Sequence, residues 1–179
     1  METKKIKAIL TDFDQTLFDT RNLKPLWKQK TPDWDSVYAK IPEIQMFEGW
    51  KWVQANLSYL PWGVVSGNVK TLINKILKYH KWERFEFVIG RYGEGGRRYR
   101  GLPKTELFEF AMQHDGFKGL NRNEVLYLGD EATDIEQANQ FGFQSGACFW
   151  GTLQPEELSA TTPTYKLNTP YDLLSVINK

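Results

Sequence analysis

The sequence predicts an α/β fold in which helices cover both faces of a doubly wound parallel sheet. Short apolar runs alternate with segments whose apolar residues recur at helical spacing, which is typical of repeated βα units. Several of these apolar runs end directly in polar residues. Because open α/β sheets bind ligands beyond the carboxyl ends of their strands, these polar residues are candidates for a functional site.

The apolar runs place the expected strands at residues 7–11, 62–65, 86–89, 125–128 and 145–149. Between and after them, apolar stripes at helical spacing indicate helices. The stripes comprise Val69, Leu72, Ile73, Ile76 and Leu77; Leu107, Phe108, Ala111 and Met112; Ile135, Ala138 and Phe141; and Leu173, Leu174 and Ile177. Gly142 is the expected stop of the third helix, and the last one follows Pro170.

The least regular region is 20–47, where Pro25, Pro32 and Pro42 exclude a long helix. We expect this region to be a small insertion within one domain that spans residues 1–179. The net charge of +1 gives no overall attraction to nucleic acid or membranes. A single cysteine, Cys148, and the absence of a signal-type or ~20-residue apolar stretch favour a cytoplasmic protein that does not span a membrane.

Four polar motifs follow these elements in a fixed order. Asp12 and Asp14, with Thr16, come after the first strand, and Ser66, Gly67 and Asn68 come after the second expected strand. Lys104 begins a helix, and Asp130 and Asp134 follow the strand at 125–128. This order resembles that of the haloacid dehalogenase-like hydrolase superfamily, in its phosphatase branch. The segment 149–158 is similar to that of phosphoglycolate-phosphatase-like members, while the small insertion also resembles near-capless polynucleotide phosphatase domains.

The resemblance implies a Rossmann-like sheet with a minimal cap at 20–47. It also implies a Mg²⁺-dependent phosphatase in which Asp12 is the nucleophile and forms an aspartyl-phosphate. Asp14 would be the general acid and base; dehalogenases lack this second acid and P-type ATPases have Thr there. Gln15 departs from the glycine most often found at its position in the family.

The remaining site residues have implied roles in binding. Ser66, the N–H of Gly67 and Lys104 would bind the phosphoryl group, and the metal would be held by Asp12, the backbone carbonyl of Asp14, and Asp130. Thr16, Asn68 and Asp134 would support them, with Asp134 orienting either Lys104 or a metal-bound water. Arg100 is an alternative to Lys104, because the family lysine is often followed by proline and the segment 100–103 offers a competing alignment.

Each motif also has a purely structural explanation. Asp12 and Asp14 could cap a turn, Ser66 could form a turn after a strand, Lys104 could be a solvated lysine, and Asp130 and Asp134 could cap a helix. The Arg-Gly-rich loop 90–101 could hold a polyanion or be a plain surface loop. The aromatic residues of the insertion, Trp27, Trp34 and Tyr38, could fill a small core or form a stacking platform.

Two substrate classes remain open, a sugar or glycolate phosphate and a nucleotide or nucleic-acid end. A small phosphorylated substrate is the favoured partner, and nucleic acid is possible but not favoured. A third hypothesis is a receiver-like module that holds a phosphoryl group without turnover. The oligomeric state is open.

Overall fold

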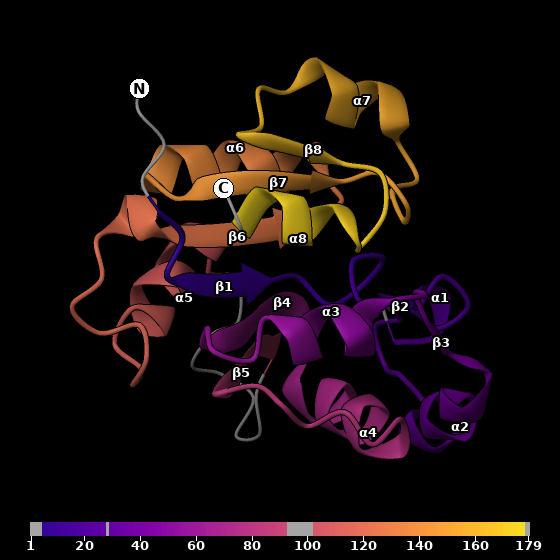
Figure 1. The fold of residues 1–179 in the computed structure, drawn as a ribbon. Coiled ribbons are helices and arrows are strands. Elements are labelled where there is room, and N and C mark those ends of the chain that lie inside the picture. Colours follow the sequence, from indigo (N-terminus) through magenta and orange to yellow (C-terminus); the bar gives the residue numbers. More distant parts are fainter. Residues whose placement is uncertain (1–4, 28, 93–101, 178–179) are drawn as a thin grey trace.

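The structure is a computed structural model that describes residues 5–27, 29–92 and 102–177. Its centre is a six-stranded sheet in the order β5-β4-β1-β6-β7-β8, drawn in Figure 1. The strands are β1 (Ala8–Thr11), β4 (Trp62–Val69), β5 (Phe87–Tyr92), β6 (Val125–Gly129), β7 (Gln144–Cys148) and β8 (Tyr165–Leu167). All neighbouring pairs run parallel, which confirms the predicted fold class. The edge strand β8 was not expected, because three residues are too few to show a pattern.

Helices cover both faces of the sheet (Figure 1). On one face, Ile9, Val64 and Leu128 share a core with residues of α3 (Trp50–Asn56), α4 (Lys70–Tyr79) and α8 (Asp172–Ile177). On the other face, Leu10 and Tyr127 pack with residues of α5 (Lys104–Ala111) and α6 (Ala132–Phe141). Alternate residues of each strand therefore belong to different cores, as a doubly wound sheet requires.

The expected helices are present as α4, α5, α6 and α8. In α4 the apolar stripe from Leu72 to Leu77 is buried, whereas Val69, expected to begin it, ends β4 and is half-buried. Helix α6 ends at Gly142, whose φ of 92° lies in the left-handed region that glycine adopts without strain. The helices α3 and α7 (Pro155–Ala160) were not expected, because each spans fewer than two turns and is too short to show a periodic pattern.

The insertion at 20–47 forms only short pieces, α1 (Lys24–Trp27), α2 (Trp34–Ala39) and the 3₁₀ helix η1 (Ile41–Glu43). The absence of a long helix agrees with the three prolines. The strands β2 (Phe18–Asp19) and β3 (Gln45–Met46) pair antiparallel at its two ends. The two ends of the insertion therefore lie side by side on the main domain.

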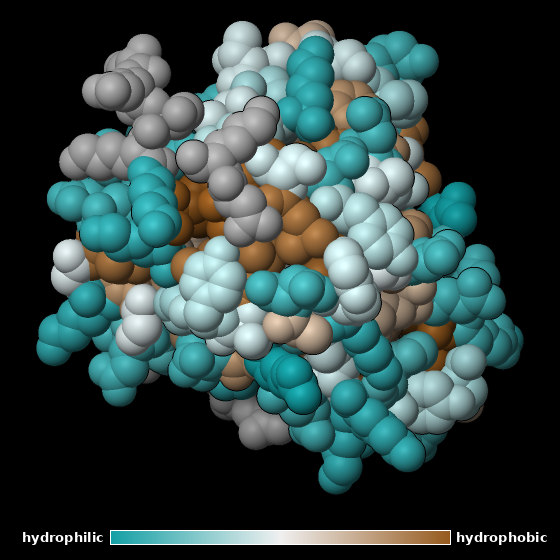
Figure 2. Space-filling view, in the orientation of Figure 1, coloured by the Kyte–Doolittle hydropathy of each residue, from teal (hydrophilic) through white to brown (hydrophobic). Residues whose placement is uncertain are grey.

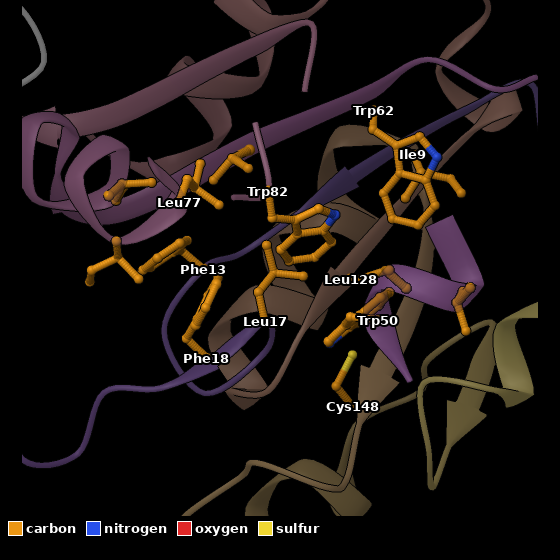
Figure 3. Close-up of a cluster of buried hydrophobic side chains, with 14 of the residues drawn as sticks. Ile9, Phe13, Leu17, Phe18, Trp50, Trp62, Leu77, Trp82, Leu128 and Cys148 are labelled. Carbon is orange, nitrogen blue, oxygen red and sulfur yellow. The ribbon is translucent and has the colours of Figure 1, made fainter. Parts of the chain in front are cut away.

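A cluster of aromatic side chains packs beneath the loop that follows β1 (Figure 3). The Trp50 ring lies 6.1 Å from Trp62, 6.5 Å from Trp82 and 5.7 Å from Trp150, measured between ring centroids. Phe13 of the loop is fully buried in this cluster, 5.0 Å from Phe18. The cluster fixes the backbone on which Asp12 and Asp14 stand.

The surface seen in Figure 2 is largely hydrophilic, with an apolar area near its centre, where β1 and α8 lie in Figure 1. Within the described ranges, no helix has both the length and the apolar character needed to cross a membrane.

Candidate active site

The polar motifs meet at the carboxyl edge of the sheet. Because β1 pairs with both β4 and β6, the carboxyl ends of these strands are neighbours. Ser66, Gly67 and Asn68 were expected after a strand that ends at residue 65, but β4 continues to Val69 and includes them. The strand ends and the loops after them line one pocket of about 950 Å³ together with the start of α5. The predicted residues found in its wall are Asp12, Asp14, Ser66, Gly67, Lys104, Asp130 and Asp134. Thr16 and Asn68 are buried beside them and bond to these acids.

Lys104 joins two of the acids. Its Nζ lies 2.9 Å from Asp12 Oδ2 and also forms an ion pair with Asp134 Oδ1, and all three side chains are buried. Burial alone would lower the pKa of Lys104, but the Asp12 and Asp134 carboxylates outweigh it and raise that pKa. The ring of Tyr127, on β6, lies below the ammonium at 5.4 Å. The cation is thus fixed against Asp12, rather than solvated at a helix end.

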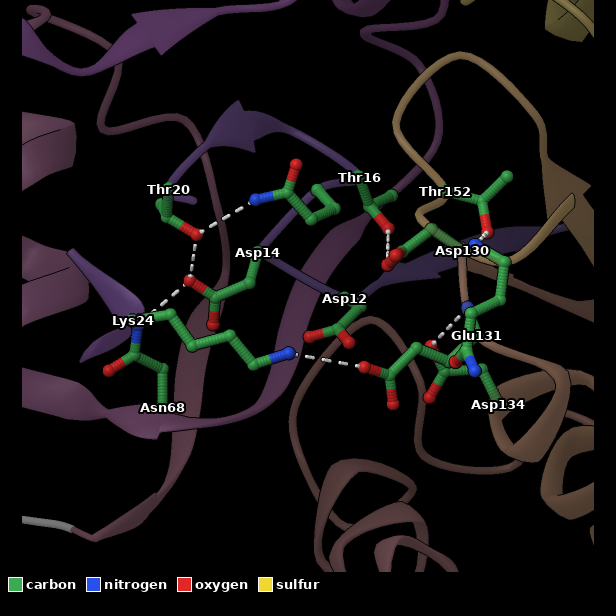
Figure 4. Close-up of polar contacts among 12 residues, drawn as sticks. Asp12, Asp14, Thr16, Thr20, Lys24, Asn68, Asp130, Glu131, Asp134 and Thr152 are labelled. Atoms are coloured by element: carbon green, nitrogen blue, oxygen red, sulfur yellow. Dashed lines mark hydrogen bonds and ion pairs between the residues drawn. The ribbon is translucent and has the colours of Figure 1, made fainter. Parts of the chain in front are cut away.

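Asp14 has a different set of partners, shown in Figure 4. Thr20 Oγ1 donates to its Oδ1 at 2.6 Å and Asn68 Nδ2 donates to the same atom at 2.9 Å. Ser66 Oγ lies 3.5 Å from its Oδ2. Burial raises the pKa of Asp14 from 3.8 to about 6, and nearby Asp12 adds to this, while the Thr20 and Asn68 hydrogen bonds oppose it. The carboxyl therefore titrates near neutral pH.

Asp130 and Asp134 come from the β6–α6 connection. Thr16 Oγ1 donates to Asp130 Oδ1 at 3.1 Å, which joins this connection to the loop after β1 (Figure 4). Asp134 is the third residue of α6 and its Oδ2 also accepts from Glu131 N at 3.4 Å, so it caps the helix while it holds Lys104. A Cβ at Gly129 would lie 2.5 Å from Asp134 Cβ, so this approach requires glycine.

The acids are arranged so that they could hold a metal ion. One carboxylate oxygen each from Asp12, Asp130 and Asp134 lies within 4.8 Å of the others, and all three residues are buried. Burial, with Asp134 and Asp12 nearby, raises the pKa of Asp130 from 3.8 to about 9. Lys104 therefore does not compensate all three carboxylates when they are ionised, and buried carboxylate oxygens are ligands that suit a hard cation such as Mg²⁺. The residues fit that ion, although Asp134 joins the cluster in addition to the acids expected from sequence.

The loop 12–16 is held by residues that the sequence did not identify. The indole N–H groups of Trp50 and Trp150 both donate to the backbone oxygen of Thr16 at 2.9 Å. Gln15 has a φ of 57°, in the left-handed region that glycine favours. A Cβ at Gly151 would lie 1.7 Å from the Gln15 oxygen, so the loop after β7 packs directly against this turn. Thr20 was missed as well, because a lone threonine in an irregular segment carries no sequence signal.

The insertion forms the outer wall of the same pocket. Lys24, Trp27, Lys30, Trp34 and Tyr38 all line it. The three aromatic side chains are half-buried, and Lys24 reaches Glu131 Oε1 at 3.5 Å from the other wall (Figure 4). Residues 93–101, with Arg100, lie outside the described residues, so both the alternative to Lys104 and the role of the Arg-Gly loop stay predictions.

Comparison with known proteins agrees with this arrangement. The family model described as haloacid dehalogenase-like hydrolase matches residues 21–148, a match that begins after Asp12 and Asp14. A phosphoglycolate phosphatase of Synechococcus elongatus is 28% identical over 141 residues, which are 78% of this chain and 62% of that protein. The chain therefore spans less than two thirds of the length of this curated relative.

Solved structures share the whole fold. A crystal structure of a candidate phosphatase from Clostridium difficile superimposes with a TM-score of 0.78 at 20% identity, covering 97% of this chain and 99% of that one. An L-2-haloacid dehalogenase from Xanthobacter autotrophicus gives 0.70 at 15% identity, covering 97% and 98%. One fold thus carries two chemistries, and the choice between them depends on the site residues.

Proposed function

The chain belongs to the haloacid dehalogenase-like hydrolase family, and from this premise we propose that it is a Mg²⁺-dependent phosphatase. It would hydrolyse a phosphate monoester through an aspartyl-phosphate on Asp12. We further propose that residues 1–179 act as one domain in which 20–47 serve as a minimal cap. The family match and the phosphoglycolate phosphatase relative support the phosphatase class.

The observation that carries this proposal is the environment of Asp14. A phosphatase must protonate a poor alkoxide leaving group, whereas a dehalogenase releases halide and needs no proton. Asp14 lines the pocket beside Asp12, and its pKa is raised to about 6, so it can both donate and accept a proton near neutral pH. A receiver module, which only holds a phosphoryl group, has no need of this second acid.

In the first half of the reaction, an Asp12 carboxylate oxygen attacks phosphorus and the bond from phosphorus to the ester oxygen breaks. Asp14 gives its proton to the departing oxygen, which leaves as an alcohol. Lys104, 2.9 Å from Asp12 Oδ2, offsets negative charge on the transferring group, and Ser66 and the Gly67 N–H line the pocket where its oxygens would lie.

In the second half, Asp14 takes a proton from a water molecule that attacks the aspartyl-phosphate, which releases inorganic phosphate and restores Asp12. A Mg²⁺ ion held by Asp12, Asp130 and the backbone of Asp14 would supply further positive charge at the phosphoryl oxygens. Asp134 fixes Lys104 from the opposite side, and Thr16 and Asn68 orient Asp130 and Asp14. These contacts support the roles that the motif order implies.

The direct test is hydrolysis of p-nitrophenyl phosphate with Mg²⁺ and with EDTA. We expect the wild-type protein to turn over only with Mg²⁺, and Asp12→Asn to lose about 10⁴-fold or more of kcat because the nucleophile is gone. Asp115→Asn, an exposed acid outside the pocket, is the matched control and should match wild type. Full turnover by Asp12→Asn would contradict the mechanism, and labelling of wild type without turnover would favour a receiver.

A further inference from the structure

Residues of the insertion at 20–47 line a part of the pocket that phosphoryl transfer does not require. We propose that this part of the pocket selects the leaving group. The structure assigns to it a phosphate monoester whose leaving group carries a flat aromatic ring, of the nucleoside monophosphate class. This inference deepens the proposed function and rests on it. It differs from what the name of the phosphoglycolate phosphatase relative would suggest.

The first argument is the size of the pocket. Its volume of about 950 Å³ lies at the upper end of ordinary small-molecule sites. The phosphoryl-binding groups Asp12, Ser66 and Lys104 form one part of its wall, and the insertion forms another part. A two-carbon acid phosphate bound at Asp12 would meet the insertion at its inner edge, where Thr20 contacts Asp14, but it would leave most of this space to water. A nucleoside is large enough to extend from one part to the other.

The second argument is the chemistry of the part of the wall that the insertion forms. Trp27 comes from α1, and Trp34 and Tyr38 come from α2. The centroids of Trp34 and Tyr38 are 5.8 Å apart with an interplanar angle of 31°, and Lys75 Nζ lies 4.6 Å from the Tyr38 centroid. These three aromatic residues are not the fully buried residues of the segment, which are Leu23 and Val37. The aromatic rings thus pack against the core at one side while they line the pocket, an arrangement suited to stacking against a flat ring.

The third argument is the distribution of charge. A glycolate-type leaving group carries a carboxylate, which would need a cation of its own in the pocket. Among the described residues that line it, Lys104 is engaged by Asp12 and Asp134, and Lys24 lies 3.5 Å from Glu131. Lys30 also lines the pocket but is exposed. Among the described residues of the wall, Lys104 is thus the one buried cation, and Lys24 and Lys30 would hold a second anion at partly or fully exposed positions, where ion pairs contribute little.

A matched pair of substrates isolates the ring. Adenosine 5′-monophosphate and ribose 5-phosphate share the sugar phosphate and differ in the base, and phosphoglycolate represents the small-acid class. For the wild-type protein we expect kcat/KM to be highest for the nucleotide and at least tenfold above ribose 5-phosphate. Stacking on an aromatic side chain contributes about 1–3 kcal/mol, equivalent to about 5- to 150-fold. Trp34→Ala should therefore lower kcat/KM for the nucleotide at least fivefold more than for ribose 5-phosphate.

Two variants keep the result specific. Trp34→Phe retains a ring and should recover most of the nucleotide activity, while Tyr38→Leu repeats the test at a second ring should Trp34→Ala fail to fold. Trp52→Ala is the control, because Trp52 is a 54% exposed aromatic residue on α3 outside the pocket. It should leave the ratio of the two substrates unchanged.

Three results would overturn the inference. These are an equal or higher kcat/KM for ribose 5-phosphate or phosphoglycolate, an equal loss for both substrates in Trp34→Ala and Tyr38→Leu, or faster release of phosphate from a 5′-phosphorylated oligonucleotide than from the mononucleotide. If hydrolysis depends on Asp12 but kcat/KM is the same with and without the base, only this inference is overturned. If the wild-type protein shows no hydrolysis that depends on Asp12, the proposed function itself is contradicted.

Discussion

Asp12 and Asp14 show how environment separates two identical side chains. They stand two positions apart on one loop, yet Asp12 pairs with Lys104 while Asp14 receives hydrogen bonds from Thr20 and Asn68. Lys104 supplies a positive charge at the first carboxylate, and burial raises the pKa of the second to about 6. The sequence predicted a catalytic role for both acids, and their partners support the proposal that one attacks and the other transfers a proton.

Replacing Asp14 by Asn should therefore affect substrates according to their leaving group. We expect kcat/KM for an alkyl phosphate to fall about 10²–10⁴-fold, since the departing alkoxide needs a proton. The loss for p-nitrophenyl phosphate should be smaller, since nitrophenolate leaves without one. Because kcat/KM reports events up to formation of the aspartyl-phosphate, the comparison isolates the proton donor.

The control for this experiment is Asp19→Asn, which removes an acid on β2 that pairs with Arg21 and does not line the pocket. It should leave both substrates within about twofold of wild type, as surface substitutions usually do. An equal loss for alkyl and nitrophenyl substrates in Asp14→Asn would show that Asp14 acts by positioning and not by donating a proton.

At the scale of elements, the loop after β1 is shaped by parts of the chain far from it. Trp50 at the start of α3 and Trp150 after β7 donate to the same Thr16 oxygen, and Gly151 packs against Gln15. A buried carbonyl with two donors is rigid, because moving it would leave both indoles unpaired. No periodicity marks such contacts, which is why the sequence identified the acids of the site and not the residues that hold their loop.

A second element, the turn that leads into β6, is fixed by an acid outside the site. Glu124 accepts from Asn121 N at 2.8 Å within the η2 turn (Arg122–Glu124), and its Oε1 lies 2.7 Å from Lys7 Nζ, just before β1. The Lys7 contact, followed by the Asn121 backbone bond, lowers the pKa of Glu124 from 4.5 to about 2. Its stabilising contribution is thus complete above about pH 4.5 and is lost as the pH falls towards 2.

We therefore expect Glu124→Gln to reduce the acid sensitivity of the fold. Thermal unfolding followed by circular dichroism at pH 7 and at pH 3 should give a smaller difference in Tm for the variant than for wild type. The variant should also be less stable than wild type at pH 7. Glu136→Gln, an exposed acid of α6, is the control and should keep the wild-type difference. Identical pH dependence in Glu124→Gln and wild type would refute this account.

At the scale of the whole molecule, the parallel sheet concentrates negative charge at one edge. Acids from the ends of two adjacent strands, Asp12 and Asp130, meet Asp134 there, with Lys104 as their buried cation. Because the pKa of Asp130 is raised to about 9, its carboxyl keeps a proton near neutral pH in the metal-free fold but loses it in the unfolded chain, which lowers the stability of the fold between about pH 4 and pH 9. A divalent cation that binds only the folded protein should reverse this penalty.

Magnesium should accordingly stabilise the protein, by about 2.7 kcal/mol at 100 times its dissociation constant, or about 5–10 °C in Tm. Asp130→Asn should remove most of this shift. It should also unfold at a higher temperature than wild type in EDTA, because Asn is neutral in both the folded and the unfolded state and removes a carboxyl whose ionised form burial disfavours. Differential scanning calorimetry with EDTA and with Mg²⁺ measures both effects, and Asp115→Asn is the control. A wild-type Mg²⁺ shift in Asp130→Asn would place the ion elsewhere.

The sequence by itself determined the family resemblance and the parallel α/β fold, and it predicted the acids of the candidate site. Strand and helix periodicity are local properties, and the ends of adjacent parallel strands necessarily meet, so motif order sufficed to bring Asp12, Ser66 and Asp130 together. The tertiary structure alone decided that Asp134 faces Lys104, that two indoles hold Thr16, and that Trp34 and Tyr38 line the pocket. These contacts depend on how elements far apart in the sequence pack together, and packing is a long-range property that local sequence does not encode.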